Sequence, residues 1–489
     1  MDLAEYVLKT VAEAIVGSGA TILIILGFIL YFQNRRTAAM QKAIVGQSIN
    51  SPLELTLSQI VLGILGGVVA SFLLTYAGVM FDEKSGIEII FLTSIILSLV
   101  KPRFICFSYS GALLGAASLI LNDLAVLVTG KSLADGYFNV DITSLMTMVG
   151  ILHIVEGVLV AIDGFRGAIP VFSNSDGKIA GGFALKRYWP IPVIIMLLFV
   201  PETTSGGTSG LVEITTPGWW PLISSSYNAE FLKDAIIAAF SIYAMLGYHS
   251  ITFTKTKKEK ALSSGVNIFT YGVILTLVAQ LASLNNVILK VLVVAFAPIA
   301  HEFMLSIQRK KELKLKPRFV SSDRGIMVLE VAPNSPAALM GIRSGDRLLE
   351  INSHEIKDEK DVLESIKQAF SKLVVKIQQS NGSEKELMYG SFTAGQRLGV
   401  VFVPKNLPKK NVVSGFGTMS FKDFLDKIYN NEEDIAKNQS EEVNDQEAND
   451  DQAKDDNLDE KAKDDKLDEQ DKVDNPSEAD EQDKEDKQD

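Results

Sequence analysis

The sequence holds very few of the residues that build disulfide or metal frameworks. Among 489 residues there is a single cysteine, Cys106, and it lies within an apolar run. One thiol excludes an intramolecular disulfide and argues against a cysteine-based metal site. The four histidines, His153, His249, His301 and His354, are scattered along the chain. The sequence therefore predicts neither a metal site nor any other cofactor.

Signature motifs of common enzyme classes are also missing. The sequence has no P-loop, no Gly-x-Gly-x-x-Gly after a strand, and no Gly-x-Ser-x-Gly turn between a strand and a helix. An intramembrane zinc protease would need two histidines one helical turn apart, with a glutamate beside the first. Here His301-Glu302 is followed by Leu305 at the second position. These absences predict a protein that is not an enzyme, and nothing in the pattern indicates nucleic acid as a partner.

Acidic charge is concentrated at the C-terminal end. Residues 431–489 contain 26 Asp or Glu against 8 Lys, about −18 of charge, whereas the whole chain carries a formal net charge of −12. The near-repeats AKDDNLDE (453–460) and AKDDKLDE (462–469) mark low complexity. Such a segment cannot bury enough apolar area to offset its ordering entropy. Residues 431–489 are predicted to be a disordered tail, after a 406–430 linker with room for a short amphipathic helix.

Long apolar runs are what the sequence has in abundance. A helix needs about 20 apolar residues to cross a bilayer, and residues 1–305 contain nine candidate runs: 11–32, 59–80, 87–100, 104–128, 142–162, 189–200, 234–253, 266–282 and 286–305. The runs 87–100 and 189–200 are short, and Pro190 and Pro192 interrupt the second. The pattern predicts a polytopic α-helical membrane domain of about nine spans, or seven if these two do not cross.

The charges of the loops predict an orientation. Lysine and arginine follow the first, third, fifth, seventh and ninth runs, and the intervening loops are neutral or acidic. The positive-inside rule then places the N-terminus outside and everything after residue 305 in the cytoplasm. The basic stretch 306–316 would also attract anionic membrane lipids, by about 1 kcal/mol per charge.

Ionisable residues within an apolar run are costly and are therefore functional candidates. His153 and Glu156 stand three residues apart in the fifth run, on one face of a helix. The pair could be a proton relay or ion site, or a hydrogen-bonded pair that fixes helix packing. Asn122-Asp123 is the expected partner from a neighbouring run. His301 and Glu302 are expected at the cytoplasmic interface, beside the basic stretch.

The stretch 325–356, GIMVLEVAPNSPAALMGIRSGDRLLEINSHEI, predicts a compact soluble fold through its turn residues. A strand is followed by a short helix that Ser335 caps, with Pro336 at its first position and Gly341 after its last turn. A second strand, a helix at 358–370, a hairpin turning at Asn381-Gly382, and a last strand at 397–403 follow.

This order, with its SPAALMGI and GDRLLEIN segments, resembles a PDZ domain over residues 317–405. The loop that opens the peptide-binding strand comes last, as in the circularly permuted order common in bacteria. The resemblance implies a groove between the last strand and the 358–370 helix, where an extended peptide adds as a strand. The candidate groove residues are Arg397, Leu398, Gly399, Val400, Val362, Leu363 and Ile366.

A multi-pass membrane region, the run LHIVEG at 152–157 and one PDZ-like domain together resemble the MinJ-like family of bacterial division-site determinants. The resemblance covers residues 1–405 by layout, and the acidic tail departs from it. It implies an adaptor at the septum and poles that links a pole-recognising scaffold to the Min division-inhibitor machinery, and a homo-oligomer is compatible with this role. Two alternatives stay open: a transporter or channel with a regulatory PDZ domain, and a catalytically dead site-2-protease-like protein that binds clients.

Overall fold

The computed structural model describes residues 2–17, 19–45, 49–134, 137–175, 178–199, 214–223, 236–284, 286–367, 372–390 and 396–405. The chain divides into two units, residues 1–418 and 419–489, and the described residues all belong to the first. The predicted linker at 406–430 and the predicted acidic tail at 431–489 lie outside the described residues.

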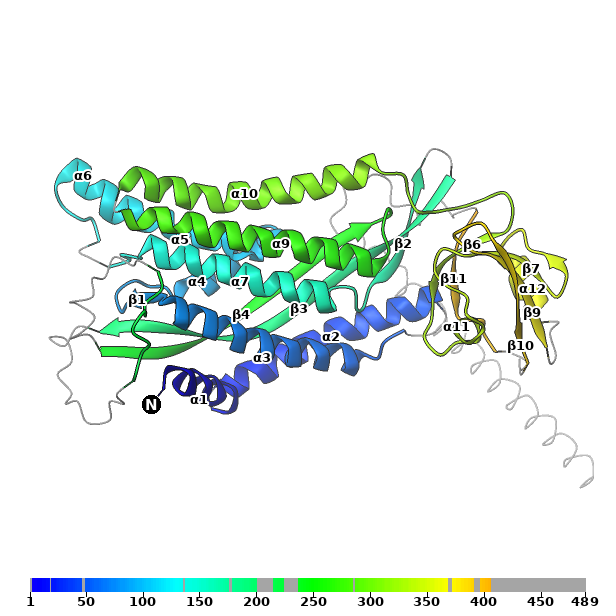
Figure 1. The fold of residues 1–489 in the computed structure, drawn as a ribbon, viewed down its shortest axis with the longest axis horizontal. Coiled ribbons are helices and arrows are strands. Elements are labelled where there is room, and N and C mark those ends of the chain that lie inside the picture. Colours follow the sequence, from blue (N-terminus) through cyan, green and yellow to red (C-terminus); the bar gives the residue numbers. More distant parts are fainter. Residues whose placement is uncertain are drawn as a thin grey trace, which may run out of the picture. The chain divides into compact units, whose positions relative to one another are not determined.

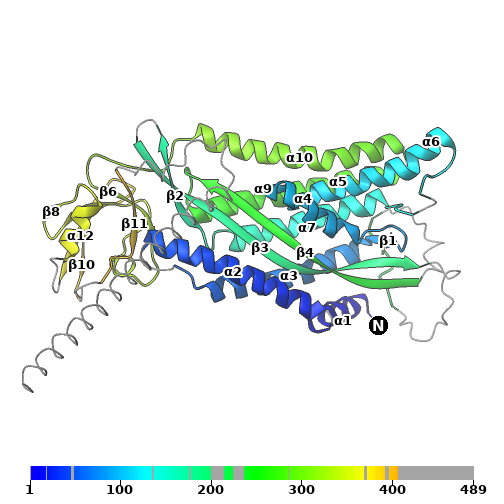
Figure 2. The same ribbon diagram turned by 180° about the vertical axis from the view of Figure 1, so that it is seen from behind.

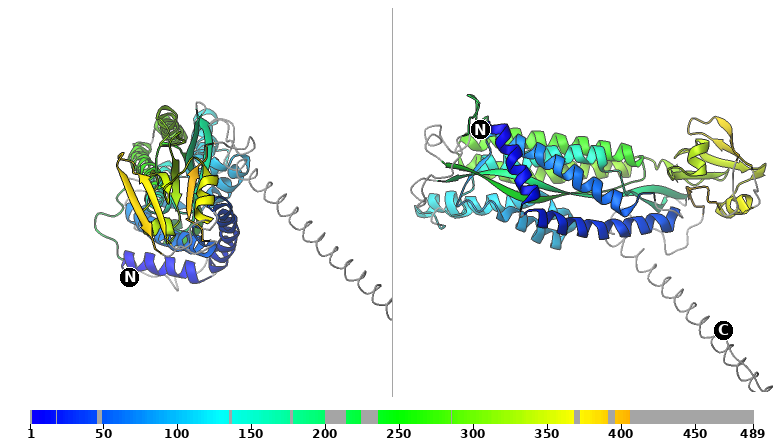
Figure 3. Two further views of the ribbon diagram at one scale, coloured as in Figure 1. Left: turned by 90° about the vertical axis from the view of Figure 1, so that its right-hand side faces the viewer. Right: turned by 90° about the horizontal axis from the view of Figure 1, so that it is seen from below.

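Apolar helices make up most of the described chain before residue 315 (Figure 1). Among described residues, five helical segments are long and apolar enough to cross a membrane: α3 (Pro52–Ala77), α5 to α6 (Phe107–Thr129), α7 (Ile142–Asp163), α9 with its 3₁₀ extension (Lys257–Leu284) and α10 (Val287–Lys314). A sixth candidate is the pair α1 (Leu3–Val16) and α2 (Gly19–Val45), which bends by 61° (Figure 3). The prediction of a helical membrane domain is confirmed.

Two runs predicted as helical spans form β-strands instead. β3 (Lys178–Phe199) contains nearly all of the 189–200 run, and β4 (Ile236–Thr252) contains most of the 234–253 run. The two strands pair antiparallel along all of β4, and Figure 2 shows the pair crossing in front of α7 and α9. β2 (Ile169–Ser175) pairs with the start of β3, and the short β1 (Met80–Asp82) runs parallel to its end. The helical prediction for these two runs was wrong.

The prolines explain why the 189–200 run favours a strand. The backbone N–H of Ile194 donates to Ser71 Oγ on α3 at 2.9 Å, so alternate residues of β3 direct their N–H side toward that helix. Pro190 and Pro192 are the two residues before Ile194 in this alternation, so they face α3 in the same way. Neither has an N–H that needs an acceptor. A proline therefore suits this edge of the strand, whereas inside a helix it would remove a hydrogen bond and clash with the preceding turn.

Glycines allow the helices to approach their neighbours closely at two interfaces. A Cβ on Gly63 or Gly67 of α3 would lie 2.2 Å from the carbonyl oxygen of Pro190 or Pro192, respectively. On α7, a Cβ on Gly157 would lie 2.5 Å from the backbone nitrogen of Phe269 in α9. Small residues are typical of helix contacts in membranes, where close van der Waals packing replaces the hydrophobic effect.

A separate sheet follows α10, with strand order β10-β9-β7-β6-β11 and β8 paired to β7. Its elements are β6 (Ile326–Val331), α11 (Pro336–Met340), β7 (Arg347–Ile351), β8 (His354–Glu355), α12 (Glu359–Lys367), β9 (Leu373–Gln378), β10 (Glu384–Tyr389) and β11 (Val400–Val403). Ser335 Oγ accepts the N–H of Ala338 at 3.2 Å, and α11 ends at Gly341 with φ of 88°. The predicted caps are confirmed. β5 (Phe319–Val320) pairs with β3, so this sheet begins at β6.

Candidate functional sites

The predicted groove elements lie at one end of the C-terminal sheet. β11 is its terminal strand and pairs with β6 alone among the described residues. Val362 of α12 and Leu398 before β11 are buried in the same core, and Ile366 and Val400 pack against it. Leu363 on α12 is 59% exposed. The start of β11 and one face of α12 thus share an apolar core.

The loop that opens β11 presents backbone donors. Its carbonyls are engaged, since Leu398 O accepts the N–H of Ala337 at 3.1 Å and Gly399 O accepts that of Ala332 at 2.8 Å. The N–H groups of Leu398 and Gly399 have no hydrogen-bond acceptor within the described part of the chain. Gly399 has φ of 75°, a left-handed conformation that glycine adopts without strain. Arg397 is exposed beside these donors.

A polar cluster lies inside the helical region and joins residues that are distant in sequence. Cys106, at the N-cap of α5 (Phe107–Ser118), has its Sγ 3.0 Å from Nε2 of His153 on α7. The same Sγ lies 3.6 Å from Nε2 of His301 on α10. His153 is 1% exposed and His301 is 8% exposed. Two histidines that are 148 positions apart in the sequence therefore share one cluster with Cys106.

Hydrogen bonds fix the orientation of both imidazole rings. His153 Nδ1 lies 2.7 Å from the carbonyl of Val149, which can only accept, so Nδ1 donates there. The hydroxyl of Tyr109 donates to Glu302 Oε1 at 2.6 Å and faces His301 Nδ1 at 3.3 Å. With both rings in the neutral form, the Nε2 lone pair of each points toward Cys106.

The remaining polar residues of the apolar runs have other partners. Glu156 Oε2 lies 3.9 Å from His153 Nε2, as a three-residue spacing on one helix allows. Asp123, expected near this pair, instead binds Lys290 with a 2.7 Å contact. Glu302 faces Arg103 at 3.5 Å rather than the basic stretch after residue 305. No local motif in the sequence could reveal the cluster, because Cys106 is 47 residues from His153 and 195 from His301.

Comparison with known proteins identifies the C-terminal sheet. Residues 327–379 match the PDZ domain family, which confirms the predicted fold of this part. Together with the long apolar helices, this match defines a membrane protein that carries a PDZ domain.

Several curated proteins resemble the chain over a stretch of domain length. The chain is 29% identical to the probable cell division topological determinant MinJ of Lacticaseibacillus paracasei over 86 residues, 17% of this chain and 23% of that protein. The MinJ of Lacticaseibacillus casei gives the same values. The putative serine protease HhoB of Synechocystis sp. is 33% identical over 69 residues, 14% of this chain and 17% of that protein. The chain thus spans about a quarter of the length of the MinJ relatives it matches.

Proposed function

We propose that the protein is a membrane-anchored, non-enzymatic adaptor that captures the extended C-terminal segment of a partner protein. The segment would pair with the edge of β11 that has no strand partner among the described residues, and lay alternate side chains against α12. Its terminal carboxylate would accept hydrogen bonds from the N–H groups of Leu398 and Gly399, which have no acceptor among the described residues, with Arg397 beside them. This is the strand-addition mode of peptide recognition.

The observation that carries this proposal is the terminal position of β11 in its sheet, with Leu398 and Val400 in the same apolar core as Val362 and Ile366 of α12. A free strand edge is a ready template for pairing with another chain, and proteins usually blunt or cover it. Here the opening loop also offers unpaired donors at the end of the edge. The combination favours a peptide with a free carboxylate over a second protein surface.

Similarity to MinJ supports a division-site role for the adaptor. On this proposal the protein sits at the septum and poles, where it connects a pole-recognising scaffold to the Min division-inhibitor machinery. The PDZ domain would face the cytoplasm, and the basic stretch 306–316 would hold it near anionic lipids.

The test uses two exposed apolar residues as a matched pair. Leu363→Glu places a charge in the groove, and Met388→Glu places the same charge on β10, where Met388 is 62% exposed. The purified full-length protein is tested against arrays of ten-residue peptides that end in a free carboxylate or an amide. We expect peptides that bind as carboxylates and lose at least tenfold in affinity as amides or with L363E, whereas M388E binds as the unchanged protein does. Equal loss in both variants, or equal binding of amides, would contradict the groove.

A truncation that lacks residues 317–405 tests the adaptor role in cells. It should insert in the membrane but lose its labelled neighbours in a proximity-labelling experiment. An unchanged list of neighbours would show that the membrane domain, and not the PDZ domain, recruits partners.

A further inference from the structure

The Cys106–His153–His301 cluster has the donor set of a transition-metal site. Its Sγ and imidazole nitrogen atoms all lie within 4.8 Å of one another. A tetrahedral zinc ion, with bonds of about 2.0–2.1 Å to nitrogen and about 2.3 Å to sulfur, separates a sulfur from a nitrogen ligand by roughly 3.6 Å. The observed separations of 3.0 and 3.6 Å differ from this by no more than a side-chain adjustment.

Counting protons shows why a cation suits this cluster. The thiol of Cys106 has one proton, but it faces two Nε2 atoms that both present lone pairs, since each ring donates through Nδ1. A single proton cannot lie in both contacts. A metal ion among the three atoms would be bound by all of them. The partners at Nδ1, the Val149 carbonyl and the Tyr109 hydroxyl, are the kind of outer contacts that orient histidine ligands.

Charge balance favours a divalent ion. With Cys106 as a thiolate and Glu156, whose Oε2 lies 3.9 Å from His153 Nε2, ionised, the site would carry two negative charges. A divalent ion would make the site neutral, which is what burial within an apolar domain requires. One thiolate, two imidazoles and a nearby carboxylate form a borderline-soft set that suits zinc, whereas magnesium and calcium prefer oxygen ligands alone.

We propose that Cys106, His153 and His301 bind one zinc ion. Binding releases the thiol proton to solvent and forms a zinc–sulfur bond and two zinc–nitrogen bonds, with no change in oxidation state. Because the ligands come from the start of α5, from α7 and from α10, the ion would tie together three elements of the helical domain. The site needs no other protein and is independent of peptide capture by the PDZ domain.

The test measures zinc in the purified full-length protein after incubation with zinc and removal of the unbound metal. Cys106→Ser and His301→Gln remove ligands. His249→Gln is the matched control, because His249 is an imidazole on β4 that contacts Tyr188 at 2.7 Å and lies outside the cluster. We expect about one zinc per chain in the unchanged protein and in H249Q. Affinity should fall at least about 100-fold in C106S and H301Q, since loss of an outer contact alone costs 10–100-fold.

Cobalt gives a second measurement that does not depend on the variants folding. Cys106 is the sole thiol of the chain, so a thiolate-to-cobalt charge-transfer band in the unchanged protein can arise only from this site. The proposal would be overturned if the protein showed neither the cobalt band nor bound zinc at saturating metal. It would also be overturned if the C106S variant bound zinc as tightly as the H249Q variant does. If the protein bound copper but not zinc, the assignment to zinc would be overturned. If Cys106 reacted rapidly with alkylating agents in the presence of zinc, the cluster would be a Cys–His nucleophile instead of a metal site.

Discussion

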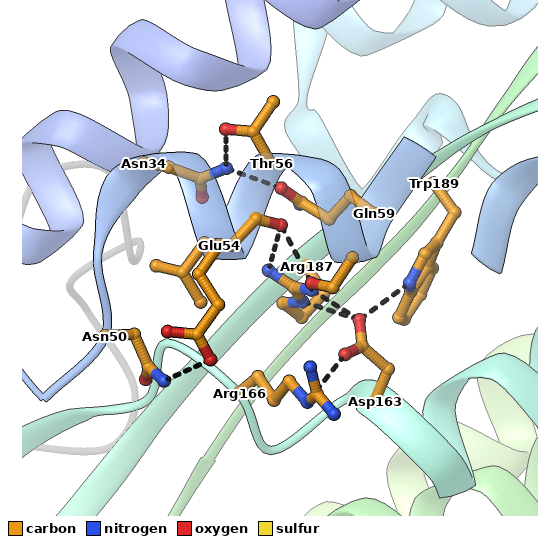
Figure 4. A network of polar contacts seen from close by, with 11 residues as sticks. Asn34, Asn50, Glu54, Thr56, Gln59, Asp163, Arg166, Arg187 and Trp189 are labelled. Carbon is orange, nitrogen blue, oxygen red and sulfur yellow. Dashed lines mark hydrogen bonds and ion pairs between the residues drawn. The ribbon is translucent and has the colours of Figure 1, made fainter. Parts of the chain in front are cut away.

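At the scale of residues, the most demanding feature is a buried ionic network at one end of α7. Asp163 is fully buried and accepts hydrogen bonds from Arg187 Nε and Trp189 Nε1, each at 2.9 Å (Figure 4). Arg166 lies 3.3 Å from its other oxygen. Arg187 is 1% exposed and also contacts the carbonyl of Leu55 on α3. The sequence suggests that Arg187 belongs to a charged loop. The structure instead places its guanidinium inside the protein, where the carboxylate of Asp163 balances its charge.

Asp163→Asn should strongly destabilise the protein. The amide keeps the size of the side chain but leaves Arg187 as an unpaired buried charge, and breaking such a pair costs about 3–5 kcal/mol. Arg166→Gln is the control, because Arg166 is half exposed and an exposed pair contributes about 0–1 kcal/mol. Unfolding in detergent mixtures, followed by tryptophan fluorescence, measures both. Equal stability of the two variants would show that Arg187 does not depend on the carboxylate.

The residues of the two candidate sites differ in how far the sequence could predict them. The turn residues around Ser335 and Gly341 act locally, so the sequence could predict the helix between them, and resemblance to the PDZ family implied the fold and the place of its groove. The cluster around Cys106 depends on how three helices pack, and the sequence contains no local signal for that packing. His153 could be singled out because an ionisable residue in an apolar run is costly. Its actual neighbours could not.

At the scale of elements, β3 and β4 are the main departure from what the sequence predicts. Hydropathy reports only that a segment avoids water, and a buried strand is as apolar as a buried helix. What decides between them is where the backbone hydrogen bonds are made, since unpaired groups are costly in an apolar environment. β3 pairs with β4 along one side, pairs with β2 and β1 near its two ends, and donates from Ile194 to Ser71 of α3 between them. Pro190 and Pro192 were the sequence signal for this edge.

Ser71→Ala should weaken the contact between α3 and β3. The variant leaves the N–H of Ile194 buried without an acceptor, which costs about 1–3 kcal/mol. Ser98→Ala on α4 (Ile89–Val100) is the control, because Ser98 is exposed and bonds only to Ile95 O of its own helix. Trp189 lies on β3 and reports unfolding there by its fluorescence. If S71A lost no more stability than S98A, the N–H of Ile194 would have found another acceptor.

At the scale of the whole membrane domain, replacing two helices by two strands does not change the predicted orientation. Leu55, Asp163 and Arg187 meet at one end, so the start of α3, the end of α7 and the first half of β3 share that end. Ala77 O accepts the N–H of Ile223, which places the end of α3 beside the segment between β3 and β4. β3 and β4 therefore leave one end and return to it, as a pair of helices would. The exchange therefore leaves the predicted odd number of crossings unchanged.

Reporter fusions test this orientation. Green fluorescent protein fused after Lys405 should be fluorescent, because that end is expected in the cytoplasm, and alkaline phosphatase at the same place should be inactive. Phosphatase inserted after Gly130, between α6 (Ala125–Thr129) and α7, should be active, since the positive-inside rule assigns that loop to the outside. Gly130 has φ of 74° and open space around it, so an insertion disturbs little packing. The reverse pattern at both places would invert the orientation and put the PDZ domain outside. Phosphatase activity at both places would show an even number of crossings between Gly130 and Lys405, which contradicts crossings by α7, α9 and α10 together with the strand pair.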